Sequence, residues 1–141
     1  MIAARRIIAL YFSQQFARFL VVGGIAVVLH WLSRFAFNAF MSYGWAIVLA
    51  YLVGILVAFV LNRAYVFPYS ERSVEAEMFF FFLINIGAFP FVWVAAYVLG
   101  EWLFPAYMSQ QAALALGHGI AILLPVFVNF ALHKFITFQG A

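Results

Sequence analysis

The stretch Asn62-Arg63-Ala64-Tyr65-Val66-Phe67 closes a long apolar segment with an amide, a fixed cation and aromatic side chains. A related stretch, His133-Lys134-Phe135-Ile136-Thr137-Phe138, closes the last apolar segment of the chain. Superimposing the two places Arg63 over Lys134 and Phe67 over Phe138. We therefore predict two repeated helix pairs, each ending in a basic and aromatic cap on the same side of a bilayer.

The composition requires a bilayer as solvent. Of the 141 residues, 70% are hydrophobic and 8% are charged, whereas a soluble domain carries about 25% charged residues. The net charge of +3 is spread along the chain without a basic run, which argues against nucleic acid as a partner. The chain has no Cys, which excludes disulfides, a thiol nucleophile and Cys-ligated metal.

Four segments are long enough to cross a membrane, because a spanning helix needs about 20 mostly apolar residues. We predict an all-α transmembrane domain over residues 16–141, with spans at about 19–40, 45–66, 78–102 and 112–136. Residues 1–15 carry Arg5 and Arg6 before a short apolar run without a cleavage site. We expect this segment to be uncleaved and to lie as a helix in the membrane interface.

The charges predict the orientation. Lys and Arg occur near both termini and near the central connection 68–77, and the connections 41–44 and 104–111 carry neither. By the positive-inside rule, both termini and the central connection are cytoplasmic, in a multi-pass protein of the cytoplasmic (inner) membrane. Four spans return the chain to its starting side, which agrees with this prediction.

Polar residues at the cytoplasmic ends of the second and fourth spans form a candidate lipid-phosphate site. They are Asn62, Arg63, Asn129, His133 and Lys134. The planar fork of Arg matches phosphate oxygens and Lys adds a point charge, while the amides and the imidazole offer hydrogen bonds. The alternative is that Arg63 and Lys134 only anchor the two helix ends at the membrane surface.

The first span has a polar face, since His30, Arg34 and Asn38 recur at helical spacing. An arginine within the hydrocarbon is costly and normally faces the bundle or a wet cavity. His30 and Arg34, with Asn85 of the third span, are therefore candidates for a translocation path. The alternatives are an Arg34–Glu101 pair and a hydrogen bond from His30 to a neighbouring helix.

The sequence contains no recognisable catalytic set and implies no cofactor, so we expect a protein that is not an enzyme. The three histidines are expected at different depths, His133 at the inner side, His30 in the middle and His118 at the outer side, which argues against a metal site. Small residues, including Gly23-Gly24, Gly54 and Gly117, are expected at close helix contacts. Pro90 and Pro125 lie inside spans and can kink them.

Three elements together resemble the GtrA-like family of small membrane proteins: Arg18-Phe19-Leu20-Val21-Val22-Gly23-Gly24, Asn62 to Phe67, and Asn129 to Phe138. The resemblance covers residues 16–138. It implies a role in cell-surface polysaccharide synthesis, in which polyprenyl-phosphate-linked sugars such as undecaprenyl-phosphate-glucose are moved across the membrane. The chain departs from the family pattern at His30, where an acid is common, and at His133-Lys134, where Asn-Arg is usual.

Two functions follow as hypotheses. The first is a translocase or carrier-binding protein for polyprenyl-phosphate-linked sugar, embedded among membrane lipids. The second is a membrane scaffold that recruits a separate glycosyltransferase. A small proton-coupled exporter fits less well, because the first span lacks an acid. Four short helices enclose little volume, so a homo-oligomer is plausible.

Overall fold

The computed structural model describes residues 8–141. Over this range the chain forms helices and no strands, and four helices are long and apolar enough to cross a membrane. They span Gln14–Asn38, Tyr43–Val66, Val74–Ala106 and Gln110–Thr137. The predicted all-α fold with four spans is confirmed. Residues 8–11 are helical, but Arg5 and Arg6 of the predicted interfacial helix lie outside the described residues.

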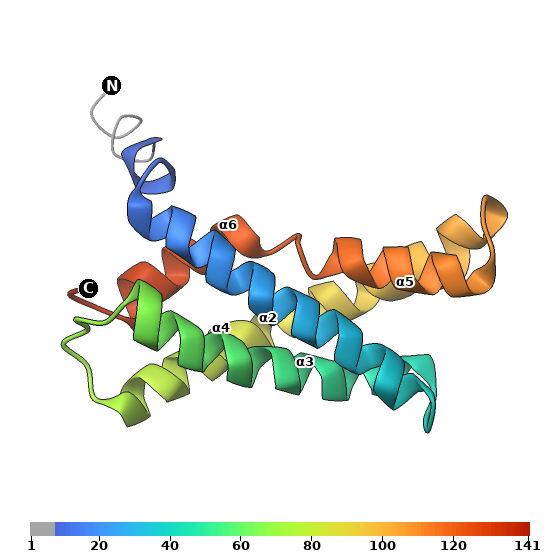
Figure 1. Cartoon of the computed structure of the whole chain (residues 1–141), viewed down its shortest axis with the longest axis horizontal. Coiled ribbons are helices and arrows are strands. Elements are labelled where there is room, and N and C mark those ends of the chain that lie inside the picture. Colours follow the sequence, from blue (N-terminus) through green and yellow to red (C-terminus); the bar gives the residue numbers. More distant parts are fainter. Residues whose placement is uncertain (1–7) are drawn as a thin grey trace.

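The four spans differ in how continuous they are (Figure 1). The first is the single helix α2 (Gln14–Asn38), and the second is α3 (Tyr43–Leu61) followed by the π-helix η1 (Asn62–Val66). The third combines α4 (Val74–Tyr97), η2 (Val98–Leu103) and η3 (Phe104–Ala106). The fourth combines α5 (Gln110–Ala121), α6 (Val126–Leu132) and η4 (His133–Thr137).

Local sequence explains where these helices begin and break. Ser13, Ser73 and Ser109 precede α2, α4 and α5, and each side chain accepts a hydrogen bond from a backbone N–H in the first turn. The fourth span breaks between α5 and α6, where Pro125 lacks the N–H that a continuous helix needs. Pro90, in contrast, lies within the uninterrupted α4.

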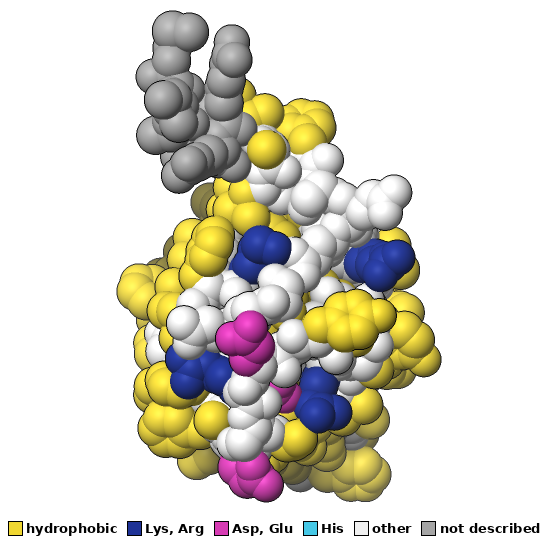
Figure 2. Space-filling view, turned by 90° about the vertical axis from the view of Figure 1, so that its left-hand side faces the viewer, with side chains coloured by type: hydrophobic (Ala, Val, Ile, Leu, Met, Phe, Trp, Pro, Cys, Tyr) yellow, Lys and Arg dark blue, Asp and Glu magenta, His cyan; other side chains and the backbone are white. Residues whose placement is uncertain are grey.

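The start of α2, the C-terminus and the connection 68–73 lie at one end of the molecule, which we call the basic end (Figure 1). Lys and Arg side chains gather there together with acidic ones (Figure 2). The connection is tied to the C-terminal segment, because the Glu71 N–H donates to the Gln139 carbonyl at 3.0 Å and the Arg72 guanidinium donates to the Gln139 side chain at 3.0 Å. The connections after α2 and before α5 lie at the opposite end.

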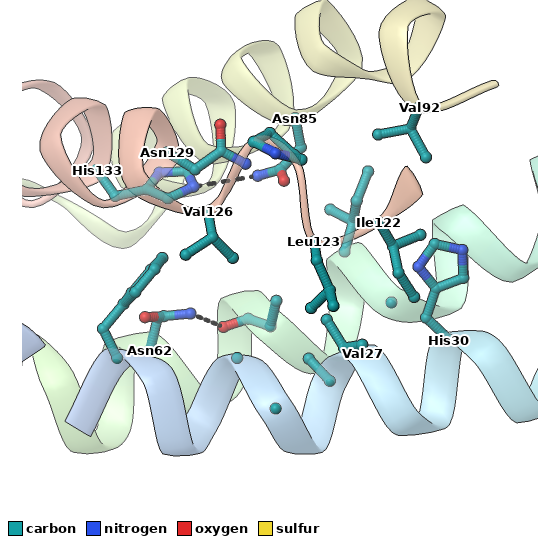
Figure 3. A pocket seen from close by; sticks show the side chains of 18 of the residues that line it. Val27, His30, Asn62, Asn85, Val92, Ile122, Leu123, Val126, Asn129 and His133 are labelled. Carbon is teal, nitrogen blue, oxygen red and sulfur yellow. Dashed lines mark hydrogen bonds between the residues drawn. The ribbon is translucent and has the colours of Figure 1, made fainter. Parts of the chain in front are cut away.

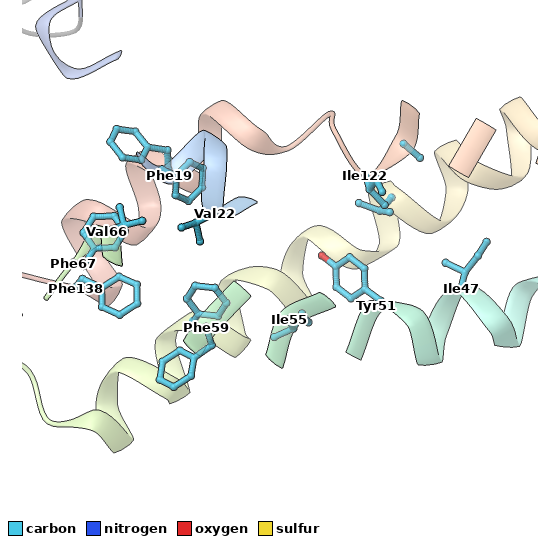
Figure 4. Packing of buried hydrophobic residues seen from close by; sticks show 14 of the residues in the cluster. Phe19, Val22, Ile47, Tyr51, Ile55, Phe59, Val66, Phe67, Ile122 and Phe138 are labelled. Atoms are coloured by element: carbon cyan, nitrogen blue, oxygen red, sulfur yellow. The ribbon is translucent and has the colours of Figure 1, made fainter. Parts of the chain in front are cut away.

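The second and fourth spans end in the same way. The Phe67 N–H donates to the Asn62 carbonyl at 2.9 Å, and the Phe138 N–H donates to the His133 carbonyl at 2.8 Å. These i to i+5 bonds give both spans a π-helical last turn. The rings of Phe67 and Phe138 stack on one another, with centroids 4.6 Å apart (Figure 4).

Other aromatic contacts occur in matched pairs. The ring of Phe59 lies 6.4 Å from that of Phe138, and the ring of Phe130 lies 6.3 Å from that of Phe67. In the same way, Phe19 packs on Phe130 at 5.1 Å and Phe81 packs on Phe59 at 5.4 Å. In each matched pair, the second contact joins the residues that the repeat makes equivalent to those of the first contact, with the two halves of the chain exchanged. The helix pairs are therefore related by an approximate twofold axis at the Phe67–Phe138 stack.

Only some of the small residues lie at close helix contacts. A Cβ on Gly54 would lie 2.8 Å from the Cβ of His30, and a Cβ on Gly117 would lie 2.6 Å from the backbone nitrogen of Gly100. A Cβ on Gly23 or Gly24, however, would meet no atom within 4 Å. The expectation of a close contact at Gly23-Gly24 is therefore wrong, because these residues border open space.

Replacing Gly117 by Ala should destabilise the bundle. The new methyl group would press on the backbone of Gly100, which cannot move aside as a side chain can, and we expect a loss of about 1–3 kcal/mol in the free energy of unfolding. Denaturation in mixed detergent micelles measures this loss. Gly87→Ala, which introduces the same methyl group into open space, is the control. Equal stability of the two variants would contradict the close approach of η2 and α5.

Candidate functional site

A cavity of about 350 Å³ lies within the bundle, lined by residues of all four spans. It reaches from the middle of the membrane-spanning region toward the basic end (Figure 3). Most of its lining is apolar. The side chains with polar atoms on its wall are His30, Tyr51, Asn62, Asn85, Asn129 and His133.

The cavity opens sideways between α2 and the fourth span. Leu20 and Gly24 of α2, and Leu123 and Phe127 on either side of Pro125, line the cavity and are also exposed at the surface of the bundle. The opening exists because the fourth span is broken there and because α2 carries no side chain at Gly23 or Gly24. We call it the side opening. In a membrane it faces lipid chains.

Contacts of α2, and of Tyr11 just before it, with the fourth span close the side opening at both of its ends. At the basic end, the Tyr11 hydroxyl donates to the Phe127 carbonyl at 3.1 Å, and Lys134 donates to the Gln15 side chain. Toward the opposite end, the Trp31 indole N–H donates to the Ala115 carbonyl at 2.9 Å. The side opening is therefore a window framed by protein at both ends.

One side of the cavity carries a hydrogen-bonded polar pair, His133 and Asn85. The imidazole of His133 is buried and stacks on Phe81, with centroids 4.2 Å apart. Its Nε2 lies 3.3 Å from Asn85 Nδ2, and its Nδ1 lies 3.0 Å from the Thr137 hydroxyl. Asn85 Nδ2 also donates to the Phe81 carbonyl at 2.8 Å. Both imidazole nitrogens and the amide nitrogen thus have partners within the protein.

The two other asparagines on the wall have unused hydrogen-bonding capacity. Asn62 is 2% exposed, and its Nδ2 donates to the Ala58 carbonyl at 2.8 Å while its Oδ1 has no partner. Asn129 is partly exposed on the cavity wall. Uncharged amide groups are therefore present on the cavity wall, and the Oδ1 of Asn62 is buried without a partner.

The two predicted phosphate ligands that carry a charge lie outside the cavity, at different helix junctions. Arg63 Nε forms an ion pair with Glu77 Oε2 at 2.8 Å, between the second span and α4. Lys134 bonds Gln15 of α2, at the edge of the side opening. Asn62, Asn129 and His133 therefore line the same cavity, with Asn62 facing it from the side opposite Asn129 and His133 (Figure 3), and Lys134 lies beside the opening.

Two expectations for the first span are corrected. Arg34 is buried with its Cζ 3.6 Å from the centre of the Phe35 ring, and Glu101 instead accepts a hydrogen bond from Gln110, so the expected Arg34–Glu101 pair is not formed. His30 and His118 were expected at different depths, yet their Nε2 atoms lie 3.1 Å apart. His30 lines the cavity and Arg34 does not.

The partner of Arg63 was not predicted from the sequence, because it depends on which helices meet. Gln15 bonds Lys134 between the first and fourth spans, and Glu77 bonds Arg63 between the third and second. The repeat that places Arg63 over Lys134 therefore also places Gln15 over Glu77. Within residues 8–141, no group of three or more His, Asp or Glu side chains is placed to hold a metal ion.

An all-α bundle of four spans around a cavity that opens to lipid defines a small multi-pass membrane protein. The family model described as GtrA/DPMS, transmembrane domain, matches residues 18–140, so the chain belongs to this family. The family indicates a membrane protein in glycan synthesis and is generally non-catalytic. The comparisons with curated proteins and with solved structures each found no match.

Proposed function

We propose that this protein binds polyprenyl-phosphate-linked sugar and moves it across the cytoplasmic membrane for cell-surface glycan synthesis. The observation that supports this function best is the partly polar cavity with its side opening between α2 and the fourth span. A sugar headgroup cannot cross bare hydrocarbon without a large desolvation cost. A cavity that opens to lipid receives the headgroup while the polyprenyl chain stays in the bilayer.

The volume of the cavity and the positions of the basic side chains fit such a ligand. The cavity of about 350 Å³ falls in the range of small-molecule sites. The positive-inside rule places the basic end in the cytoplasm. The lipid phosphate then lies near Lys134 at the edge of the side opening, with Arg63 as a second cation at that end. Asn62, Asn129 and His133 face the headgroup, and the path continues past Asn85 toward His30 and, beyond the cavity, Arg34.

Transport in liposomes tests this function. Purified protein is reconstituted with fluorescent polyprenyl-phosphate-glucose, and a membrane-impermeant quencher follows the fraction of lipid on each side. We expect exchange to be faster than in protein-free liposomes. Exchange at the protein-free rate, together with co-purification of a glycosyltransferase, would instead support the alternative that the protein is a scaffold for that enzyme.

Replacing Lys134 by Gln should weaken lipid binding. If Lys134 holds the phosphate, removing this charged hydrogen bond lowers the affinity for polyprenyl phosphate by about tenfold or more. Binding to protein in nanodiscs measures the change. Arg18→Gln is the matched control. It removes one exposed cation from the basic end, and Arg18 does not line the cavity. An equal loss in both variants would contradict a specific role for Lys134.

A further inference from the structure

The two halves of the molecule differ in how the junction between their two helices is filled. The matched pairs Gln15–Lys134 and Glu77–Arg63 align the first span with the third and the second with the fourth. The aromatic pairs Phe19–Phe130 and Phe81–Phe59 follow the same alignment one turn further along the spans. The same alignment makes Gly23 the equivalent of Asn85 and Asn62 the equivalent of His133, so the pair Asn85 and His133 in one half corresponds to Gly23 and Asn62 in the other.

In the half that contains Asn85 and His133, the two side chains bond one another and fill the junction between their helices. In the other half, Gly23 contributes no side chain, and a Cβ there would meet no atom within 4 Å. Asn62 keeps its Nδ2 on the Ala58 carbonyl, and its Oδ1 is left without a partner. The space that Asn85 fills in one half is thus part of the cavity in the other (Figure 3).

The mostly apolar cavity wall carries a few polar side chains but no Asp, Glu, Lys or Arg. Its two histidines are engaged, His133 with Asn85 and Thr137, and His30 with His118. The other polar groups are the Tyr51 hydroxyl, which donates to the Asn85 backbone carbonyl at 2.8 Å, and the amides of Asn62 and Asn129, and all of them are uncharged. Such a wall stabilises hydroxyl groups, whereas a buried carboxylate or ammonium group would find no opposite charge and would be strongly disfavoured.

We infer that the space beside Gly23 is a subsite for an uncharged sugar ring, whose hydroxyl groups bond the amides of Asn62 and Asn129, and that it rejects sugars carrying a carboxylate or an ammonium group. This inference rests on the proposed function, since it names the part of the lipid that enters the cavity. The phosphate stays outside, at Lys134. Asn62 Oδ1 is buried and has no partner, so a small turn of this amide toward a sugar hydroxyl would replace an unsatisfied acceptor by a hydrogen-bonded one.

Binding of three lipids to the protein in nanodiscs tests the subsite: polyprenyl phosphate, polyprenyl-phosphate-glucose and polyprenyl-phosphate-glucuronate. We expect the glucose lipid to bind about tenfold more tightly than the sugar-free lipid, and the glucuronate lipid to show no such gain. Gly23→Asn should refill the space with the side chain found at the equivalent Asn85. It should bring the affinity for the glucose lipid down to that for the sugar-free lipid and leave the latter within twofold of its original value.

Gly87→Asn is the matched control, because Gly87 of α4 also borders open space and does not line the cavity. Asn129→Leu is a second variant that removes an amide from the wall and should act like Gly23→Asn. Equal binding of the glucose lipid and the sugar-free lipid to the unmodified protein would overturn the subsite and leave the proposed function intact. Equal binding of the glucose and glucuronate lipids would overturn the selection by charge, and absence of binding to all three would overturn both proposals.

Discussion

Replacing Arg63 by Met is expected to lower the free energy of unfolding by about 3 kcal/mol, the lower end of the cost of breaking a buried ion pair. The Glu77 side chain is 2% exposed, and the ion pair with Arg63 is its only one within the described residues. Without Arg63, a buried carboxylate is left uncompensated. The lower end applies because the Arg63 side chain is 47% exposed and part of its interaction is screened by water.

The double variant Arg63→Met with Glu77→Met is the control for this prediction. Removing both charges leaves no buried ion, so most of the lost stability should return. Unfolding in mixed micelles measures all three proteins under the same conditions. A double variant as unstable as Arg63→Met would show that the side chain of Arg63, and not its charge, matters for stability. Lipid affinity of the stable double variant would also measure directly what Arg63 contributes to phosphate binding.

Replacing Gly24 by Trp should abolish transport without unfolding the protein. Gly24 lines the cavity at the side opening, is exposed, and has no atom within 4 Å of the position of a Cβ. An indole at this position has room to project into the side opening and obstruct it. We expect lipid exchange in liposomes to fall at least tenfold, toward the protein-free rate, while the unfolding midpoint stays close to that of the unmodified protein.

Gly87→Trp provides the comparison, since it places the same ring on the α4 surface away from the cavity. It should exchange lipid at the rate of the unmodified protein. If Gly24→Trp also exchanges lipid at that rate, the headgroup does not enter through the side opening. If glycan synthesis in cells is unaffected by Gly24→Trp, the scaffold hypothesis becomes the better explanation.

The fold could be predicted because hydropathy and charge determine how deep each segment lies along the membrane normal. The number of spans follows from four apolar segments, and the repeat follows from the similar ends at Asn62 and His133. Pairings between helices could not be predicted in this way. Apolar residues surround each helix, so no stripe of hydrophobic residues tells which side faces the bundle. This is why Arg34 was expected beside Glu101 and instead packs on Phe35.

In the candidate site, too, the depth of residues in the membrane could be predicted and the pairing of helices could not. Asn62, Asn129 and His133 were predicted at one depth, and all three line the same cavity. The ion pair of Arg63 with Glu77 and the contact of His30 with His118 were not predicted, because both pairings depend on how the helices are rotated about their axes. The role of Gly23-Gly24 was also missed, since small residues suit an open cavity as well as a tight contact.

The shared π-helical ends and the approximate twofold axis have a consequence for biogenesis. Each half is a helical hairpin that starts and ends at the basic end. Along the chain, the two hairpins are linked by the short connection 68–73. Either hairpin therefore has the topology to enter a membrane by itself in the same orientation as the other. A single chain of this kind is what fusion of two copies of an ancestral hairpin would produce. After such a fusion, one copy is free to keep its interface filled while the other becomes hollow.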